Sequence, residues 1–217
     1  MTSDATFAIL LGGTLEIDDR VRALIAGARA IAADGGMKHA AALGLVPELW
    51  VGDFDSSSPD LTEMHAASER LPFPAEKNFT DGELAIEQAI ERGAGRLVLV
   101  GAFGGERTDH ALSHLFQAIA LAERGLDVVL TSGTEEAVPL LPGSRLLDLP
   151  AGSLFSVAGF TALTGLSLEN VKYPLNKADI AFGATRTISN VAEGPVTVSL
   201  VSGRALVVAR PHDFTGA

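Results

Sequence analysis

The sequence predicts an α/β domain with a mainly parallel sheet, followed by an all-β domain of sandwich or barrel-like form. Segments with strand-like and helix-like hydrophobic spacing alternate through the first half of the chain. After Gly133 the segments become short and β-branched or alternating, as at 154–158, 196–201 and 205–209, and Gly and Pro punctuate them. No segment from Val138 onward has convincing helical spacing. We therefore place the two domains at residues 1–135 and 140–217.

The composition excludes several classes of protein. The 217 residues are 47% hydrophobic, which is enough to build a core and argues against disorder. The absence of cysteine rules out disulfides and thiolate metal sites. No run of ~18 uncharged apolar residues occurs, so no membrane partner is predicted. The first residues lack the pattern of a secretory signal, and we expect a cytoplasmic protein.

The net charge of −11 bears on the partners. A surface of this sign repels nucleic acid, because nucleic-acid binding depends on Lys and Arg contacts to phosphate, and no nucleic-acid partner is expected. A nucleotide can still bind where metal ions and a few local cations offset its phosphates. An acidic cleft also favours a cationic second substrate.

Each element of the first half has a local cause. Apolar runs indicate strands at 6–11, 30–33, 49–51, 96–100 and 127–131. Helical spacing or helix-start residues indicate helices at 17–29, 37–43, 60–70, 81–92 and 109–124. Thr80 or Asp81 is the expected N-cap of the fourth helix, and Gly44 and Gly93 are expected helix stops. Residues 71–76 are expected to be extended.

Acidic or Gly-rich stretches follow four of the predicted strands. They are Gly12-Gly13, Asp34-Gly35-Gly36, Asp53 with Asp55, and 101–105. In a parallel sheet, ligands bind at the carboxyl ends of the strands. The coincidence predicts that these stretches form one site.

Asp53 and Asp55 lie two residues apart, just after the strand at 49–51. In an extended chain, residues i and i+2 point to the same side, so the two carboxylates would offer oxygen ligands to one cation. Such ligation suits Mg²⁺. A polar turn, in which Asp and Ser bond their own backbone, is the competing interpretation of a lone Asp-x-Asp. The other acidic, Gly-rich stretches favour the metal site.

Two further stretches have both a functional and a structural interpretation. Asp34-Gly35-Gly36 opens a helix, where backbone N–H groups suit a phosphate or a ribose hydroxyl; the alternative is an N-cap with a tight turn. Lys77 could meet phosphate, and Asp81 could be a third metal ligand or accept a substrate proton. The alternative there is helix capping beside a solvated lysine.

The stretch after the strand at 96–100 combines glycines with charged residues. Gly104 and Gly105 let the backbone approach a ligand, although a flexible connection explains them too. Arg107 can clamp phosphate, and Asp109 can cap the helix or face the metal region. The two histidines that follow, at 110 and 114, are expected to pack rather than bind metal, because no further His or Cys motif accompanies them.

The second half offers fewer candidates. Tyr173 is the only tyrosine and could stack on a heteroaromatic ring, while simple packing is the plainer interpretation. Ser189 and Asn190, taken alone, indicate an ordinary turn.

Taken together and in order, these stretches resemble thiamine pyrophosphokinase. The resemblance rests on residues 33–36, 52–56, 77–81, 101–110, 172–175 and 189–190. Each motif is short, but their order and spacing cover nearly the whole chain, which makes the match specific.

The resemblance implies transfer of a diphosphate from ATP to the hydroxyl of thiamine, with Mg²⁺ and release of AMP. It also implies a homodimer whose thiamine pocket lies between one subunit's α/β domain, which binds ATP, and the other's β domain. By position it implies metal-binding and catalytic carboxylates at Asp53, Asp55 and Asp81, with Asp109 as a further catalytic residue. It assigns ATP to Asp34, Gly35, Gly36, Lys77, Gly104, Gly105 and Arg107, and thiamine to Tyr173, Ser189 and Asn190.

The chain departs from the family pattern at three places. Glu106 separates the glycine pair from Arg107, Asn78 replaces the usual Asp after Lys77, and Asn170-Val171 replaces the usual Gly-Leu. Two other functions stay open: a diphosphokinase for another heteroaromatic alcohol such as a pterin, and a nucleotide- or thiamine-binding module without turnover. Clustered carboxylates beside a phosphate site favour turnover over simple binding.

Overall fold

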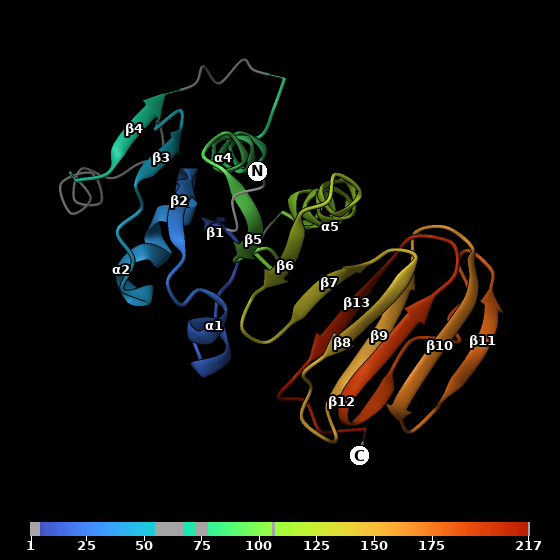
Figure 1. Ribbon diagram of the computed structural model, residues 1–217. Helices are drawn as coiled ribbons and strands as arrows, with labels where there is room; N and C mark the ends of the chain where they lie inside the picture. Colours follow the sequence, from blue (N-terminus) through green and yellow to red (C-terminus); the bar gives the residue numbers. More distant parts are fainter. Residues whose placement is uncertain (1–4, 55–66, 73–77, 106, 217) are drawn as a thin grey trace. The chain divides into compact units, whose positions relative to one another are not determined.

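A computed structural model describes residues 5–54, 67–72, 78–105 and 107–216 (Figure 1). The chain divides into two compact units. The first comprises residues 1–114 and 126–133, and the second comprises 115–125 and 134–217. Residues 115–125 thus group with the β-rich unit, whereas the predicted domains place them in the α/β domain.

The first unit contains a parallel sheet. Its strands are β1 (Ala5–Leu10), β2 (Arg29–Ala33), β3 (Leu49–Gly52), β4 (Glu69–Pro72), β5 (Ala94–Val100) and β6 (Asp127–Thr131). They are ordered β6-β5-β1-β2-β3-β4, and every neighbouring pair is parallel. The predicted parallel α/β architecture is confirmed.

The central strand β1 buries both of its faces. Ala8 and Leu10 point to one side, where they pack with residues of β2, β3 and α1 (Asp19–Leu24). Phe7 and Ile9 are equally buried and, because side chains alternate along a strand, point to the other side. Helix α4 (Asp81–Glu91) packs against β1, β2, β3 and β5. Near-continuous apolar strands are what a sheet covered on both faces requires.

Several predicted helices differ in extent from those found. The helix expected at 17–29 is only α1, which Asp18 caps through its side chain. The helix expected at 37–43 is a 3₁₀ helix, η1 (Asp34–His39), followed by the single turn α2 (Ala40–Leu43), which ends at the left-handed Gly44. Helix α5 (Thr108–Glu123) begins one residue before its predicted start.

The helix predicted at 60–70 is wrong at its end. Glu69 and Arg70 belong to β4, which pairs with β3 in parallel register. The ladder to β3 overrides the helical propensity of this segment, since propensity is a weak preference that tertiary pairing can outweigh. Residues 60–66 lie outside the described part of the chain.

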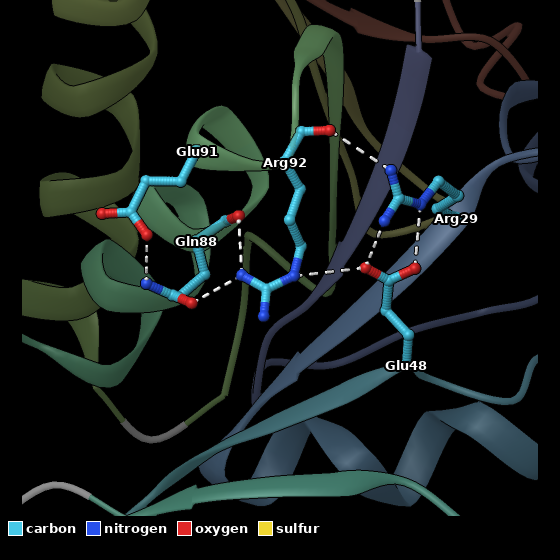
Figure 2. A network of polar contacts seen from close by, with 5 residues as sticks. All are labelled: Arg29, Glu48, Gln88, Glu91 and Arg92. Atoms are coloured by element: carbon cyan, nitrogen blue, oxygen red, sulfur yellow. Dashed lines mark hydrogen bonds and ion pairs between the residues drawn. The ribbon is translucent and has the colours of Figure 1, made fainter.

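A polar network joins the amino ends of β2 and β3 to the end of α4 (Figure 2). The guanidinium of Arg29 donates two hydrogen bonds to the Glu48 carboxylate, at 2.8 and 2.7 Å. Arg92 lies 3.5 Å from the same carboxylate and donates to the side chain of Gln88. Because the strands are parallel, this network and the carboxyl-end loops lie at opposite edges of the sheet.

The strands of the second unit form an antiparallel β-sandwich. Its strands are β7 (Glu136–Leu140), β8 (Gly143–Leu147), β9 (Leu154–Gly159), β10 (Leu163–Val171), β11 (Leu175–Ile180), β12 (Asn190–Leu200) and β13 (Ala205–Arg210). One layer is β9-β13-β7 and the other is β8-β12-β10-β11, and the start of β12 also pairs with β9. Apolar side chains from both layers form one core. The all-β prediction for this half is confirmed.

In the described part of the chain, no helix has the length and apolar character needed to cross a membrane.

Candidate functional site

A pocket of about 530 Å³ opens at the carboxyl edge of the parallel sheet. The loops that follow β1, β2 and β5 line it at 11–14, 33–35 and 101–105. The starts of α4 and α5 complete the wall. Strand β1 lies between β2 and β5 in the sheet, so the crossovers diverge here, and such a switch point is where open α/β sheets bind ligands.

Glycines let these loops approach one another closely. A Cβ atom on Gly13 would lie 2.4 Å from the carbonyl oxygen of Gly101, and one on Gly36 would lie 2.0 Å from that of Leu10. Gly104 has a φ of 66° and lies against Thr14. Glycine is therefore needed at these positions because loops of the protein approach one another closely. Close approach of the backbone to a ligand stays a prediction.

Asp34 is an exceptional residue in the lining. Its φ of 41° is in the left-handed region that non-glycine residues seldom adopt. Its Oδ1 atom is buried and has no hydrogen-bond partner among the described residues. Since buried polar atoms are normally paired, this oxygen is suited to receive a donor or a cation from a ligand.

Two cationic side chains line the pocket. Lys38, on η1, donates from Nζ to the carbonyl oxygen of Gly12 at 2.6 Å. Arg107 forms a two-pronged pair with Asp109, at 3.0 and 2.7 Å. That hydrogen-bonded guanidinium lowers the pKa of the Asp109 carboxyl to about 2. Asp109 therefore stays ionised and holds Arg107 at the rim.

The pocket also contains histidines with different environments. His114 is buried, and its Nδ1 lies 3.1 Å from the carbonyl oxygen of Ala102. His39 is not part of the lining, and its Nε2 lies 3.0 Å from the carbonyl oxygen of the lining residue Gly13. Burial lowers the pKa of both rings. His110 is exposed and lines the pocket, so the expected packing role fits His114 but not His110.

The start of α4 supplies a carboxylate and backbone donors. Thr80 caps the helix by accepting from the N–H of Glu83 at 3.2 Å, as predicted. Asp81 and Gly82 then face the pocket. The first turn of a helix carries unpaired N–H groups and a positive dipole end, which together favour phosphate.

The predicted metal triad is only partly covered by the structure. Asp53 follows β3 and is half-buried, and Asp81 lies in the pocket wall. Asp55 and Lys77 lie outside the described residues. Within the described part of the chain, no three acidic, His or Cys side chains are grouped closely enough to hold an ion. The shared cation of Asp53, Asp55 and Asp81 stays a prediction.

The three candidates of the second unit are close together. The Asn190 side chain accepts from the N–H of Tyr173 at 3.1 Å and donates to its carbonyl oxygen at 2.9 Å. Ser189 precedes Asn190 with a φ of 62°, and its N–H donates to the side chain of Ser156. Asn190 is buried while Tyr173 is 59% exposed. Tyr173 therefore does not pack in the core, and its role in a site stays a prediction.

Lys38, Thr14 and His110 were not predicted as site residues. Lys38 lies inside the helix expected at 37–43, but Asp34 precedes that helix, so no α-helical spacing linked the two residues. Thr14 and His110 adjoin motifs that were recognised.

Family comparisons match both units of the chain. The model described as "Thiamin pyrophosphokinase, catalytic domain" matches residues 22–130, and "Thiamin pyrophosphokinase, vitamin B1 binding domain" matches residues 149–204. The second match contains Tyr173, Ser189 and Asn190.

Individual relatives give the same result. Thiamine pyrophosphokinase of Bacillus subtilis (strain 168) is 28% identical over 151 residues, which cover 68% of this chain and 70% of that protein. The crystal structure of the enzyme of that name from Bacillus subtilis superposes with a TM-score of 0.84 at 26% identity, covering 96% of this chain and 100% of the other. The one from Geobacillus thermodenitrificans gives 0.81 at 27% identity, covering 98% and 100%.

Proposed function

The chain belongs to the thiamine pyrophosphokinase family, and from this premise we propose that it transfers a diphosphate from ATP to the hydroxyl of thiamine, giving thiamine diphosphate and AMP. The observation that carries the proposal is the glycine-walled pocket at the switch point of the sheet, with Asp34, Asp81 and Lys38 in its lining. A pterin alcohol as acceptor is not favoured, because the matched relatives are named for thiamine.

ATP is proposed to bind with its phosphates along the glycine loops. Gly35, Gly104 and Gly105 line the pocket without side chains, and Lys38 and Arg107 offer positive charge there. Lys77 joins them by position in the family motif. Gly36 lies outside the lining and lets the loop pack against Leu10. Phosphoryl-type transfer needs positioning and charge neutralisation more than covalent help. The glycine loops would supply the positioning, and the cationic side chains would supply the neutralisation.

We propose Mg²⁺ as the cofactor. The donor chemistry suits an oxygen-ligated cation, because carboxylates line the pocket and the Asp34 Oδ1 atom is buried without a partner among the described residues. Asp53, Asp55 and Asp81 would hold the ion. When bound, Mg²⁺ neutralises phosphate charge and so favours departure of AMP.

In the proposed reaction, the thiamine hydroxyl oxygen attacks the β-phosphorus of ATP. The new P–O bond forms as the bond from the β-phosphorus to the α-phosphate oxygen breaks, and AMP leaves with that electron pair. Asp81 accepts the hydroxyl proton. Asp109 acts through Arg107, whose guanidinium it holds in a fixed fork beside the phosphates.

Thiamine is proposed to bind at the surface formed by Tyr173, Ser189 and Asn190. The exposed Tyr173 ring supplies a flat face for a heteroaromatic ring, and the buried Asn190 holds the Tyr173 backbone in place. The acidic character of the protein suits the positive thiazolium. We further propose a cytoplasmic homodimer in which this surface and the ATP pocket of the partner subunit complete one site.

The test is product identification by mass spectrometry after incubation with ATP, Mg²⁺ and thiamine. Thiamine diphosphate and AMP are expected in equal amounts. ADP with thiamine monophosphate would assign a different transfer. Binding of ATP and thiamine in a calorimeter without any AMP would identify a non-catalytic module. A pterin alcohol in place of thiamine serves as the acceptor control, and Asp81→Asn serves as the inactive protein control.

A further inference from the structure

We propose that Trp50 is a positioning residue for the two acidic loops, which are the loop with Asp34 after β2 and the loop with Asp53 after β3. It acts through a hydrogen bond to Asp34 and a ring contact with Phe54. Trp50 is the only tryptophan, lies in β3 and is fully buried. The inference rests on the proposed function, because it concerns the carboxylates of the same site.

The contact with Asp34 is specific to an indole. Trp50 Nε1 donates to the carbonyl oxygen of Asp34 at 3.0 Å. Asp34 holds a φ of 41°, a conformation that persists only where its surroundings impose it. Its buried Oδ1 atom has no partner among the described residues, so hydrogen bonds at this oxygen do not set the direction of the carboxylate. The backbone and the atoms packed beside it therefore set that direction, and the indole N–H bonds to that backbone.

The neighbouring strand adds a second constraint on Asp34. A Cβ atom on Gly52 would lie 3.4 Å from the Cα atom of Asp34 and 3.6 Å from Oδ1, which is ordinary contact distance. The backbone of β3 therefore passes directly beside Asp34. Trp50 and Gly52 lie on the same strand, so a shift of β3 moves both the donor and the wall.

The contact with Phe54 reaches the second acidic loop. The two rings meet edge to face, with centroids 5.0 Å apart and planes at 87°. Phe54 also has a positive φ, 62°, which is rare for a bulky residue. It directly follows Asp53 in the sequence, so holding its ring restrains the backbone next to that carboxylate. Trp50 thus touches one left-handed residue in each acidic loop.

A purely structural core role predicts a different outcome on substitution. Any large apolar side chain could fill the space among Leu10, Ala32 and Met37, which belong to the same cluster. An apolar side chain has no donor for the Asp34 carbonyl oxygen, whereas Trp50 bonds to it through Nε1. Trp50→Phe keeps an aromatic ring for Phe54 and removes the donor, so it separates the two roles.

The first measurement needs no ligand. Hydrogen–deuterium exchange of peptides covering 34–36 is expected to become about tenfold faster in Trp50→Phe, because removing a constraint opens a strained segment locally. Phe7→Leu is the matched control, since it shrinks a fully buried aromatic residue of the same sheet that contacts Arg29 instead. It should lower the melting temperature without changing exchange at 34–36. Unchanged exchange at 34–36 in Trp50→Phe would overturn the inference.

The second measurement ties Trp50 to the site. We expect Trp50→Phe to bind Mg²⁺ with α,β-methylene-ATP about tenfold more weakly in a calorimeter, because small displacements of site groups are costly. In protein that already carries Asp34→Asn, Trp50→Phe should weaken this binding little further, since residues that act through one another have non-additive effects. If the fold-losses of affinity of the two single variants multiplied fully in the double variant, the link to Asp34 would be overturned. Failure of the parent protein to form AMP would refute the proposed function instead, and the exchange result would still decide the role of Trp50.

Discussion

His114 Nδ1 lies 3.1 Å from the carbonyl oxygen of Ala102, and this contact determines which ring nitrogen carries the proton. A carbonyl oxygen can only accept, so Nδ1 must be the donor. Burial lowers the pKa of the ring, which favours the neutral form. His39, whose Nε2 contacts the carbonyl of Gly13, has its pKa lowered by the same cause.

These two histidines predict the direction of the pH dependence of stability. The ordinary pKa of a histidine is 6.5, and the pKa of each of these two rings is lower in the folded state. Below 6.5 the unfolded chain therefore binds more protons than the folded one, so the free energy of unfolding should fall as the pH drops from neutral through that value. Urea unfolding measured across this range is the test. His39→Gln with His114→Gln should flatten the slope, and an unchanged slope would contradict the assignment.

Lys38 is predicted to contribute to ATP binding. We expect Lys38→Met to raise the KM for ATP by at least about tenfold, because a charge-assisted hydrogen bond contributes about 1.5–3 kcal/mol. The KM for thiamine should change little. Steady-state kinetics in saturating Mg²⁺ measure both values. Arg22→Met is the control, since it removes one positive charge from an exposed position of helix α1. If both substitutions raised the KM for ATP equally, Lys38 would contribute only through the net charge of the protein and not through a contact with ATP.

The pocket loops that contain Asp34, Gly104 and Asp81 could be predicted from the sequence, because one rule on parallel sheets determines where they lie. Asp34, Gly104 and Asp81 follow strands or begin helices, and the carboxyl ends of parallel strands meet at one edge regardless of the details of packing. Lys38 escaped prediction because η1 is a 3₁₀ helix, in which side chains recur every ~3 residues rather than every 3.6. Its direction could not be obtained from an α-helical pattern.

Tyr173 and Asn190 show where local reasoning fails. Each belongs to an unremarkable turn or strand end in the sequence. They meet because the N–H of Lys172 donates to the carbonyl oxygen of Val191, which brings the end of β10 to the start of β12. Strand pairing over this sequence separation is a product of the whole sandwich, so only the family resemblance could associate these residues beforehand.

Gly36 is predicted to be essential for stability. A Cβ atom there would lie 2.0 Å from the carbonyl oxygen of Leu10 and 2.9 Å from the N–H nitrogen of Leu11. Because both contacts are with backbone, Gly36→Ala should cost at least about 2 kcal/mol of unfolding free energy. Gly35→Ala is the matched control, since no atom lies within 4 Å of the added Cβ. Thermal unfolding distinguishes them, and equal melting temperatures would refute the steric account.

The network in Figure 2 predicts a change in stability that is separate from activity. The Glu48 carboxylate forms ion pairs with both Arg29 and Arg92, and its side chain is 33% exposed. Glu48→Gln should lower the free energy of unfolding by about 0.5–1 kcal/mol, a small value because solvent screens the pairs. The KM for ATP should not change, because the network lies at the amino edge of the sheet. A raised KM would show that this edge is coupled to the pocket.

The proposed site between subunits predicts recovery of activity on mixing two inactive variants. Asp81→Asn disables the α/β unit, and Tyr173→Ala disables the β-sandwich. If each site combines one unit from each subunit, a hybrid dimer contains one doubly damaged site and one intact site. Half of randomly reassociated dimers are hybrids, so AMP formation should reach about one quarter of the parental rate. Each variant refolded alone should stay inactive, as should a mixture that contains the double variant in place of either single one. Hybrid dimers that form but stay inactive would assign both halves of the site to a single subunit.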